Sequence, residues 1–215
     1  IYRNGIRNIL SHIDLSSSSR VKAIVTWTGF WLATSQARRA AAYIGSAAPL
    51  FVIDCGKGAG QIRRESNRGL KDIINTIMVA ASECADRNSE PDATHKGKRS
   101  LSGFFTTTCA WIGLLNAFGG KRHFTVSLDL LETLVMSSTS PEIEIPFEEF
   151  LFENLYNKWG LLIGREAASD AGLSTRMDAS IFEDNELIFA QHLLAAGLMH
   201  DYSDATRMVS TRSLK

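Results

Sequence analysis

The chain has 215 residues, of which 45% are hydrophobic and 21% charged, a balance typical of soluble globular proteins. Its 23 Lys and Arg and its 23 Asp and Glu cancel, which excludes a uniformly basic nucleic-acid coat, an acidic disordered tail and a low-complexity chain. No apolar run approaches the roughly 18 residues that a bilayer-spanning helix needs. The first residues show no signal-peptide pattern, so we expect a cytoplasmic protein.

The neutral total conceals two halves of opposite charge. Residues 1–120 hold 15 Lys/Arg and 8 Asp/Glu, whereas residues 121–215 hold 8 Lys/Arg and 15 Asp/Glu. Such an asymmetry indicates two surfaces with different partners. In the basic half, the residues that we expect to contact phosphates or an acidic partner are Arg63, Arg64, Arg68, Lys71, Lys96, Lys98 and Arg99. The alternative is that these are solvated helix and loop charges.

The N-terminal half predicts helices around one short strand. Apolar residues at helical spacing predict helices over 1–13, 21–43, 61–86 and 104–118. Leu50 to Ile53 predict a short buried strand, because three of these four apolar residues are β-branched or aromatic. Ser16 to Ser19 predict a turn or linker. The polar stretch 87–100, which contains Pro91, predicts a mobile loop.

The cysteines and tryptophans favour structural roles. Cys55, Cys84 and Cys109 lack the spacing of a zinc site or a disulfide framework, so we expect reduced and mostly buried thiols. The four tryptophans fall within apolar runs and are expected in the core rather than as stacking platforms for nucleic-acid bases. We predict no metal site.

The C-terminal third predicts an ordered series of short elements. These are a helix over 126–136, a short strand over 142–145, a helix from Phe147 to Trp159, a helix that follows a capping Asn185, and a strand-turn-strand over 198–210. The order of helix, strand, two helices and two-stranded ribbon resembles a winged-helix domain over residues 124–211. The whole chain is then predicted to be α+β and mostly helical, with a basic helical domain over 1–120 that has one short buried strand.

The resemblance implies either DNA binding or protein docking, and charge favours docking. DNA-binding winged helices place Lys and Arg on the third helix and the wing. Here the third helix has no Lys or Arg between Asn185 and Leu198, and it begins among Glu183, Asp184 and Glu186. Phosphates near this helix would meet repulsion rather than release counterions. We therefore interpret the C-terminal third as a protein-docking element.

A glycine-rich stretch supplies the alternative function. Asp54, Gly56, Gly58 and Gly60 follow the predicted strand and precede a helix. This pattern resembles the first motif of class I methyltransferases, whose glycines let the backbone approach S-adenosylmethionine. The resemblance implies that Asp54 to Gly60 bind this cofactor, with Glu83 as the acidic ribose contact. The other interpretations are a glycine turn without a ligand and a backbone cradle for phosphate.

Taken together, the residues favour a non-enzymatic interaction module. We expect a subunit or fragment of a larger nucleic-acid-associated assembly, in which the basic N-terminal surface contacts DNA or RNA. The acidic C-terminal part then docks a protein partner or a second copy. On this interpretation the chain needs no cofactor and contacts no membrane, and the alternative is a methyltransferase-like enzyme that uses Asp54 to Gly60.

Overall fold

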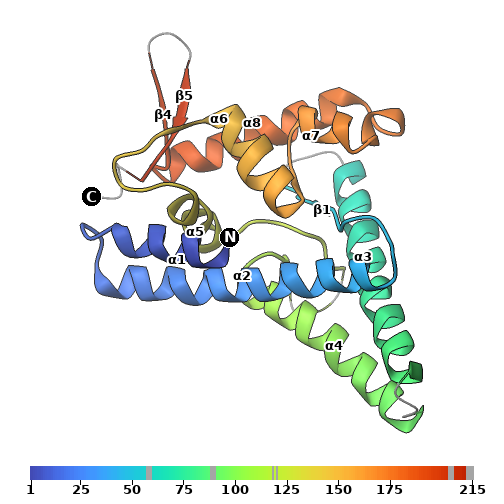
Figure 1. The fold of residues 1–215 in the computed structure, drawn as a ribbon. Helices are drawn as coiled ribbons and strands as arrows, with labels where there is room; N and C mark the ends of the chain where they lie inside the picture. Colours follow the sequence, from blue (N-terminus) through green and yellow to red (C-terminus); the bar gives the residue numbers. More distant parts are fainter. Residues whose placement is uncertain (57–59, 88–90, 118, 120, 203–205, 212–215) are drawn as a thin grey trace.

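A computed structural model describes residues 1–56, 60–87, 91–117, 119, 121–202 and 206–211, with the backbone alone at 86, 87, 91–96 and 98. The fold is α+β and mostly helical, as predicted (Figure 1). Its strands are short, and its long helices lie in the N-terminal half of the chain.

The first two helices run side by side at one edge of the molecule. α1 spans Tyr2–Ser11 and α2 spans Ser17–Tyr43. The linker predicted at the serine run is wrong, because these serines start α2. Ser16 is the N-cap, and its hydroxyl oxygen accepts a hydrogen bond from the backbone N–H of Ser19 at 3.1 Å. The bond satisfies an amide that the first helical turn would otherwise leave unpaired.

The next two helices form a hairpin that projects from the body of the molecule (Figure 1). α3 spans Gly60–Arg87 and α4 spans Pro91–Trp111. The loop predicted over 87–100 is therefore wrong from Pro91 onward, since proline fits the first turn of a helix. α4 packs on α3, and residues 91–100 extend the helix that was predicted from residue 104. The helix predicted to reach residue 118 ends at Trp111, and Gly113 turns the chain with φ +78°.

A two-stranded parallel sheet joins the two halves of the chain. β1 (Phe51–Val52) pairs with β3 (Leu161–Leu162), so the buried strand predicted at 50–53 is confirmed. Gly160 precedes β3 with φ +76°, and a Cβ there would lie 2.6 Å from the carbonyl oxygen of Pro49. Only glycine fits this close approach.

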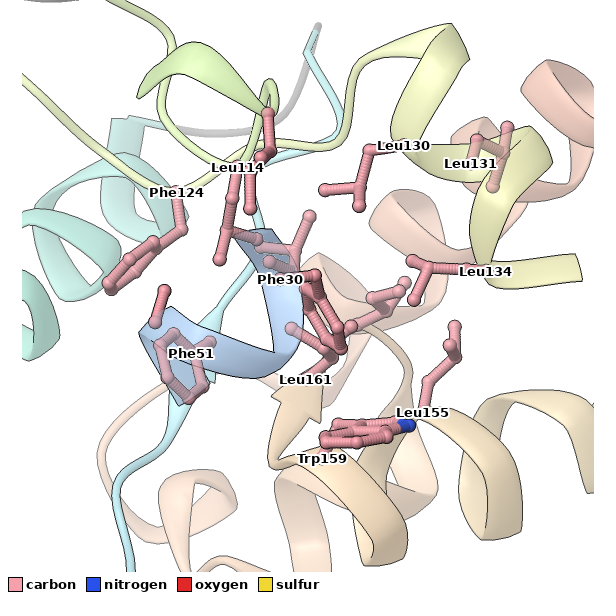
Figure 2. Close-up of a cluster of buried hydrophobic side chains, with 14 of the residues drawn as sticks. Phe30, Phe51, Leu114, Phe124, Leu130, Leu131, Leu134, Leu155, Trp159 and Leu161 are labelled. Atoms are coloured by element: carbon pink, nitrogen blue, oxygen red, sulfur yellow. The ribbon is translucent and has the colours of Figure 1, made fainter. Parts of the chain in front are cut away.

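Aromatic rings from both halves pack around this sheet (Figure 2). Phe51 meets Phe124 edge to face at a centroid distance of 5.1 Å, and Trp159 meets Phe30 in the same way, also at 5.1 Å. These four rings belong to one buried cluster that also includes Leu130. The core therefore crosses the proposed boundary near residue 120, and the division into two domains stays a prediction.

The C-terminal part contains the predicted helices and strands in order, but the strand predicted over 142–145 begins only at Ile145. Its members are α5 (Leu128–Ser138), β2 (Ile145–Pro146), α6 (Phe147–Glu149) continued by the π-helix η1 (Phe150–Asn157), α7 (Arg165–Asp170), the 3-10 helix η2 (Leu173–Thr175), α8 (Ala179–Ala195), β4 (Met199–Asp201) and β5 (Arg207–Val209). The two strands predicted over 198–210 are confirmed, since β4 and β5 pair antiparallel, and β2 joins them in a sheet of order β2-β5-β4. The turn predicted between them falls on residues 203–205, which lie outside the described residues. α7 and η2 lie between η1 and α8, and the resemblance to a winged helix stays a prediction.

The start of the third helix differs from the prediction. α8 begins at Ala179, and its N-cap is Asp178, whose carboxylate accepts a hydrogen bond from the backbone N–H of Ser180 at 3.0 Å. Asn185 lies inside the helix and is buried. Asparagine is a common N-cap because its side chain hydrogen-bonds to nearby backbone groups, but the side chain of Asn185 hydrogen-bonds to backbone groups of distant segments.

Candidate functional site

The first basic cluster lies on the N-terminal half of α3, and acidic neighbours offset part of its charge. The Nε of Arg63 donates a hydrogen bond to the buried Asp54 carboxylate at 2.9 Å. Arg68 lies between two carboxylates, 3.8 Å from that of Glu65 and 3.9 Å from that of Asp72. Arg63 and Arg68 therefore contribute less to the attraction of phosphates than the sequence indicates.

A second pair of cations lies beside the remaining basic residues of α3. The backbone oxygen of Arg122 accepts a hydrogen bond from the side chain of Asn67 at 2.6 Å, which holds Lys121 and Arg122 along the helix. Arg64, Asn67 and Lys71 share one helical face by their spacing. Arg64, Lys71, Lys121 and Arg122 form what we name the α3 basic surface. Among the described residues, the ion pairs include none of these four side chains.

Sequence reasoning missed Lys121 and Arg122, and it grouped residues that the fold keeps apart. Lys96, Lys98 and Arg99 lie on the first half of α4, and Arg99 is exposed. The side chains of Lys96 and Lys98 lie outside the described residues. Because α3 is ~42 Å long and the hairpin reverses direction at its end, this cluster lies far from Arg64. The two predicted basic clusters therefore do not form one surface.

The candidate chemical site lies at the carboxyl end of β1. Asp54 is only 2% exposed, and its Oδ1 accepts a hydrogen bond from the backbone N–H of Gly56 at 3.0 Å. Its Oδ2 pairs with Arg63 and lies 3.4 Å from Nε2 of His123. Both oxygens of the Asp54 carboxylate therefore have polar partners. The carboxylate thus fastens the first turn of α3 and the segment at His123 to the end of β1.

His123 is the residue of this site that sequence reasoning did not assign. Burial lowers the pKa of its imidazole, and Arg63 acts in the same direction, whereas Asp54 opposes the change. No spacing rule connects a histidine with a carboxylate so distant in sequence, so the pair becomes visible only in the fold.

Cys55 and Asn185 complete this end of the sheet. The side-chain amide of Asn185 donates to the carbonyl oxygens of Ile53 and Ile163, each at 3.0 Å, and its oxygen accepts from the backbone N–H of Cys55 at 3.0 Å. Asn185 thereby ties the ends of β1 and β3 to α8. Burial raises the pKa of the Cys55 thiol, which disfavours the reactive thiolate. The three hydrogen bonds of Asn185 make this end of the sheet rigid, whereas the buried Cys55 thiol is poorly suited to act as a nucleophile.

The glycine-rich motif keeps part of the expected geometry. Gly56 follows β1 with φ +107°, a conformation that favours glycine, and Gly60 is the first residue of α3. Gly58 lies outside the described residues. Glu83 lies on α3, 23 positions beyond Gly60, which places it ~35 Å along the helix. The ribose contact predicted for Glu83 is therefore wrong for a cofactor held at Gly60, and the cofactor site itself stays a prediction.

No group of three or more His, Cys, Asp or Glu side chains among the described residues is arranged to hold a metal ion. His200 and Asp201 lie on β4, in the predicted wing. None of the described helices is both long and apolar enough to cross a membrane.

The exposed side of α8 is acidic and partly apolar. Glu183 pairs with Arg165 at 2.5 Å, and Asp184 is exposed one residue further along. Leu187 is 55% exposed, and Leu194 is also exposed. α8 is the helix predicted as the third helix of a winged-helix-like domain, and its exposed side carries carboxylates and leucines.

No protein-family model, curated protein or solved structure matches the chain.

Proposed function

We propose that the chain is a non-enzymatic module of a nucleic-acid-associated assembly, and that the α3 basic surface contacts phosphates. The observation that carries this proposal is the convergence of Arg64 and Lys71 with Lys121 and Arg122, none of which shares an ion pair with a described carboxylate. Cations without acidic partners release counterions when they neutralise phosphates, and this release drives association.

The second part of the proposal concerns α8. Its exposed side offers carboxylates and leucines, which repel phosphates and bury favourably against protein. We therefore assign nucleic-acid contact to α3 and protein docking to α8. The two roles use opposite charges, in agreement with the division of charge along the sequence.

Fluorescence anisotropy with a labelled DNA duplex, at two salt concentrations, tests the phosphate contacts. Replacement of Arg64, Lys71 and Lys121 by alanine should weaken binding and reduce the slope of log affinity against log salt by roughly 0.9 for each phosphate that is no longer neutralised. The matched control is Arg3→Ala with Arg7→Ala on α1, since both side chains are exposed cations outside the α3 basic surface. This control should leave affinity and slope unchanged.

Two further outcomes bear on the assignment. Arg68→Ala should have a smaller effect than Lys71→Ala, because Glu65 and Asp72 already offset the charge of Arg68. Salt-independent binding, or an equal weakening in the α1 control, would remove the α3 basic surface as the contact. Calorimetric binding of S-adenosylmethionine by the same preparation would replace this proposal with the methyltransferase-like alternative.

A further inference from the structure

Two packed helices present an apolar face to solvent. On α4, Leu101, Phe104 and Trp111 are exposed, and Trp111 is 62% exposed, which contradicts its predicted place in the core. On α2, Val25 and Leu32 are exposed. These five side chains make up what we name the α2–α4 face.

Contacts between the helices show that these side chains form one surface. The side chain of Gln36 on α2 donates to the carbonyl oxygen of Leu101 on α4 at 2.9 Å. Further along, a Cβ at Gly29 would lie 2.6 Å from the side chain of Ile112, so the two backbones approach closely there. At the Trp111 end, Lys22, Val25 and Asp129 help to line a hollow of about 430 Å³. A surface with this many apolar side chains marks an interaction site.

The charge of the two helices restricts what covers this face. α2 carries four Lys/Arg and no Asp or Glu, and α4 carries three Lys/Arg and one Asp. Of the α2 cations, Lys22 pairs with Asp129 at 2.7 Å and Arg38 donates to the carbonyl oxygen of Lys158. Arg39 shares its side of α2 with Leu32 by spacing, and it is exposed. A partner that suits this environment is an acidic helix with exposed apolar side chains.

The chain itself contains such a helix. The exposed residues of α8 include Glu183, Asp184, Leu187 and Leu194, and the helix has no Lys or Arg. The exposed stretch from Asp184 to Leu194 is ~15 Å long, and so is the stretch from Leu101 to Trp111 on α4. The two surfaces therefore agree in length and apolar character and are opposite in charge.

We propose that the exposed side of α8 in one copy docks on the α2–α4 face of a second copy of this chain. This inference rests on the docking role proposed for α8 and not on nucleic-acid binding. Leu187 and Leu194 then cover Phe104 and Trp111, while Asp184 approaches Arg39 of α2. Burial of the leucines and aromatic rings supplies affinity, and the opposite charges orient the contact.

Sedimentation velocity over a range of protein concentrations tests the contact. The chain should self-associate, and Leu187→Lys with Leu194→Lys should give a monomer. Trp111→Glu should also give a monomer, because loss of a large aromatic contact residue weakens association by roughly 30-fold or more. The matched control is Ile143→Lys, which changes a side chain as exposed as Leu187 (55%) outside both surfaces. Circular dichroism establishes that each variant is folded.

A mixture of the two monomeric variants decides the assignment. The Trp111→Glu chain keeps an intact α8, and the Leu187→Lys, Leu194→Lys chain keeps an intact α2–α4 face. An equimolar mixture should therefore form a 1:1 complex that neither variant forms alone. A mixture that stays monomeric while the unchanged chain self-associates would overturn the proposal, and so would an unchanged chain that is monomeric throughout. Neither result would alter the anisotropy test of the α3 basic surface.

Discussion

Replacement of Asn185 by alanine tests whether one side chain holds the carboxyl end of the parallel sheet. Asn185 is 1% exposed and forms three hydrogen bonds with backbone groups, two to the carbonyls of Ile53 and Ile163 and one to the N–H of Cys55. The backbone bonds of the described residues offer these three groups no other partner. Alanine would leave all three unpaired in a buried site.

The cost follows from the number of groups left unpaired. A buried donor or acceptor without a partner costs about 1–3 kcal/mol, so three groups cost about 3 kcal/mol at the lower limit. A water molecule in the space vacated by the amide would restore part of the pairing, so we expect a decrease in stability of about 3–5 kcal/mol rather than the upper limit. Since domains are stable by only about 5–15 kcal/mol, this is a large fraction of the total.

Urea unfolding followed by tryptophan fluorescence measures this decrease. We expect the midpoint to fall by about 1 M or more, with an unchanged dependence on denaturant. Asn75→Ala on the exposed side of α3 is the control and should stay within about 0.5 kcal/mol of the unchanged chain. Were Asn185→Ala to cost less than about 1 kcal/mol, the argument that this side chain fastens β1 and β3 to α8 would be refuted.

Two further predictions concern packing and pH. Gly5→Ala should destabilise the fold by about 1–3 kcal/mol, because its Cβ would lie 2.4 Å from the buried indole of Trp27. A Cβ at Gly103 on α4 would meet no atom within 4 Å, so Gly103→Ala should instead stabilise the chain by up to about 1 kcal/mol, as measured by the same urea unfolding. Burial lowers the pKa of His12 from its usual 6.5, so the unfolded chain takes up this proton first as pH falls. The contribution of His12 to the free energy of unfolding should therefore be fully present above pH 6.5 and decrease below it. His12→Asn should reduce this decrease in unfolding curves recorded across that pH range. If the decrease is as large in the variant, it belongs to other groups.

Local patterns in the sequence were sufficient for much of the fold. Apolar residues at helical spacing located α1, α2, α3 and α5, and the run from Leu50 to Ile53 located β1. The strand-turn-strand pattern over 198–210 located β4 and β5. Each of these signals comes from residues within a few positions of one another, since helix and strand periods are local properties of the chain.

The corrections have a common cause, which is the influence of distant residues. Pro91 opens α4, which packs on α3, although residues 87–100 lack an apolar period. Asn185 leaves its expected capping role because its amide finds partners in β1 and β3. Trp111 is apolar but exposed, because helical spacing alone does not say which side of α4 meets α2.

The sequence by itself determined the helical character of the chain, the positions of β1, β4 and β5 and the opposite charges of its two halves. The tertiary structure decided which of those residues act together. Asn67 and Arg122 are 55 positions apart, and Cys55 and Asn185 are 130 apart. Nothing in a periodic pattern encodes such pairs, because they depend on how α3, α8 and β1 pack. The α3 basic surface and the Asp54–His123 pair are therefore products of packing, assembled from residues whose local signals are ordinary.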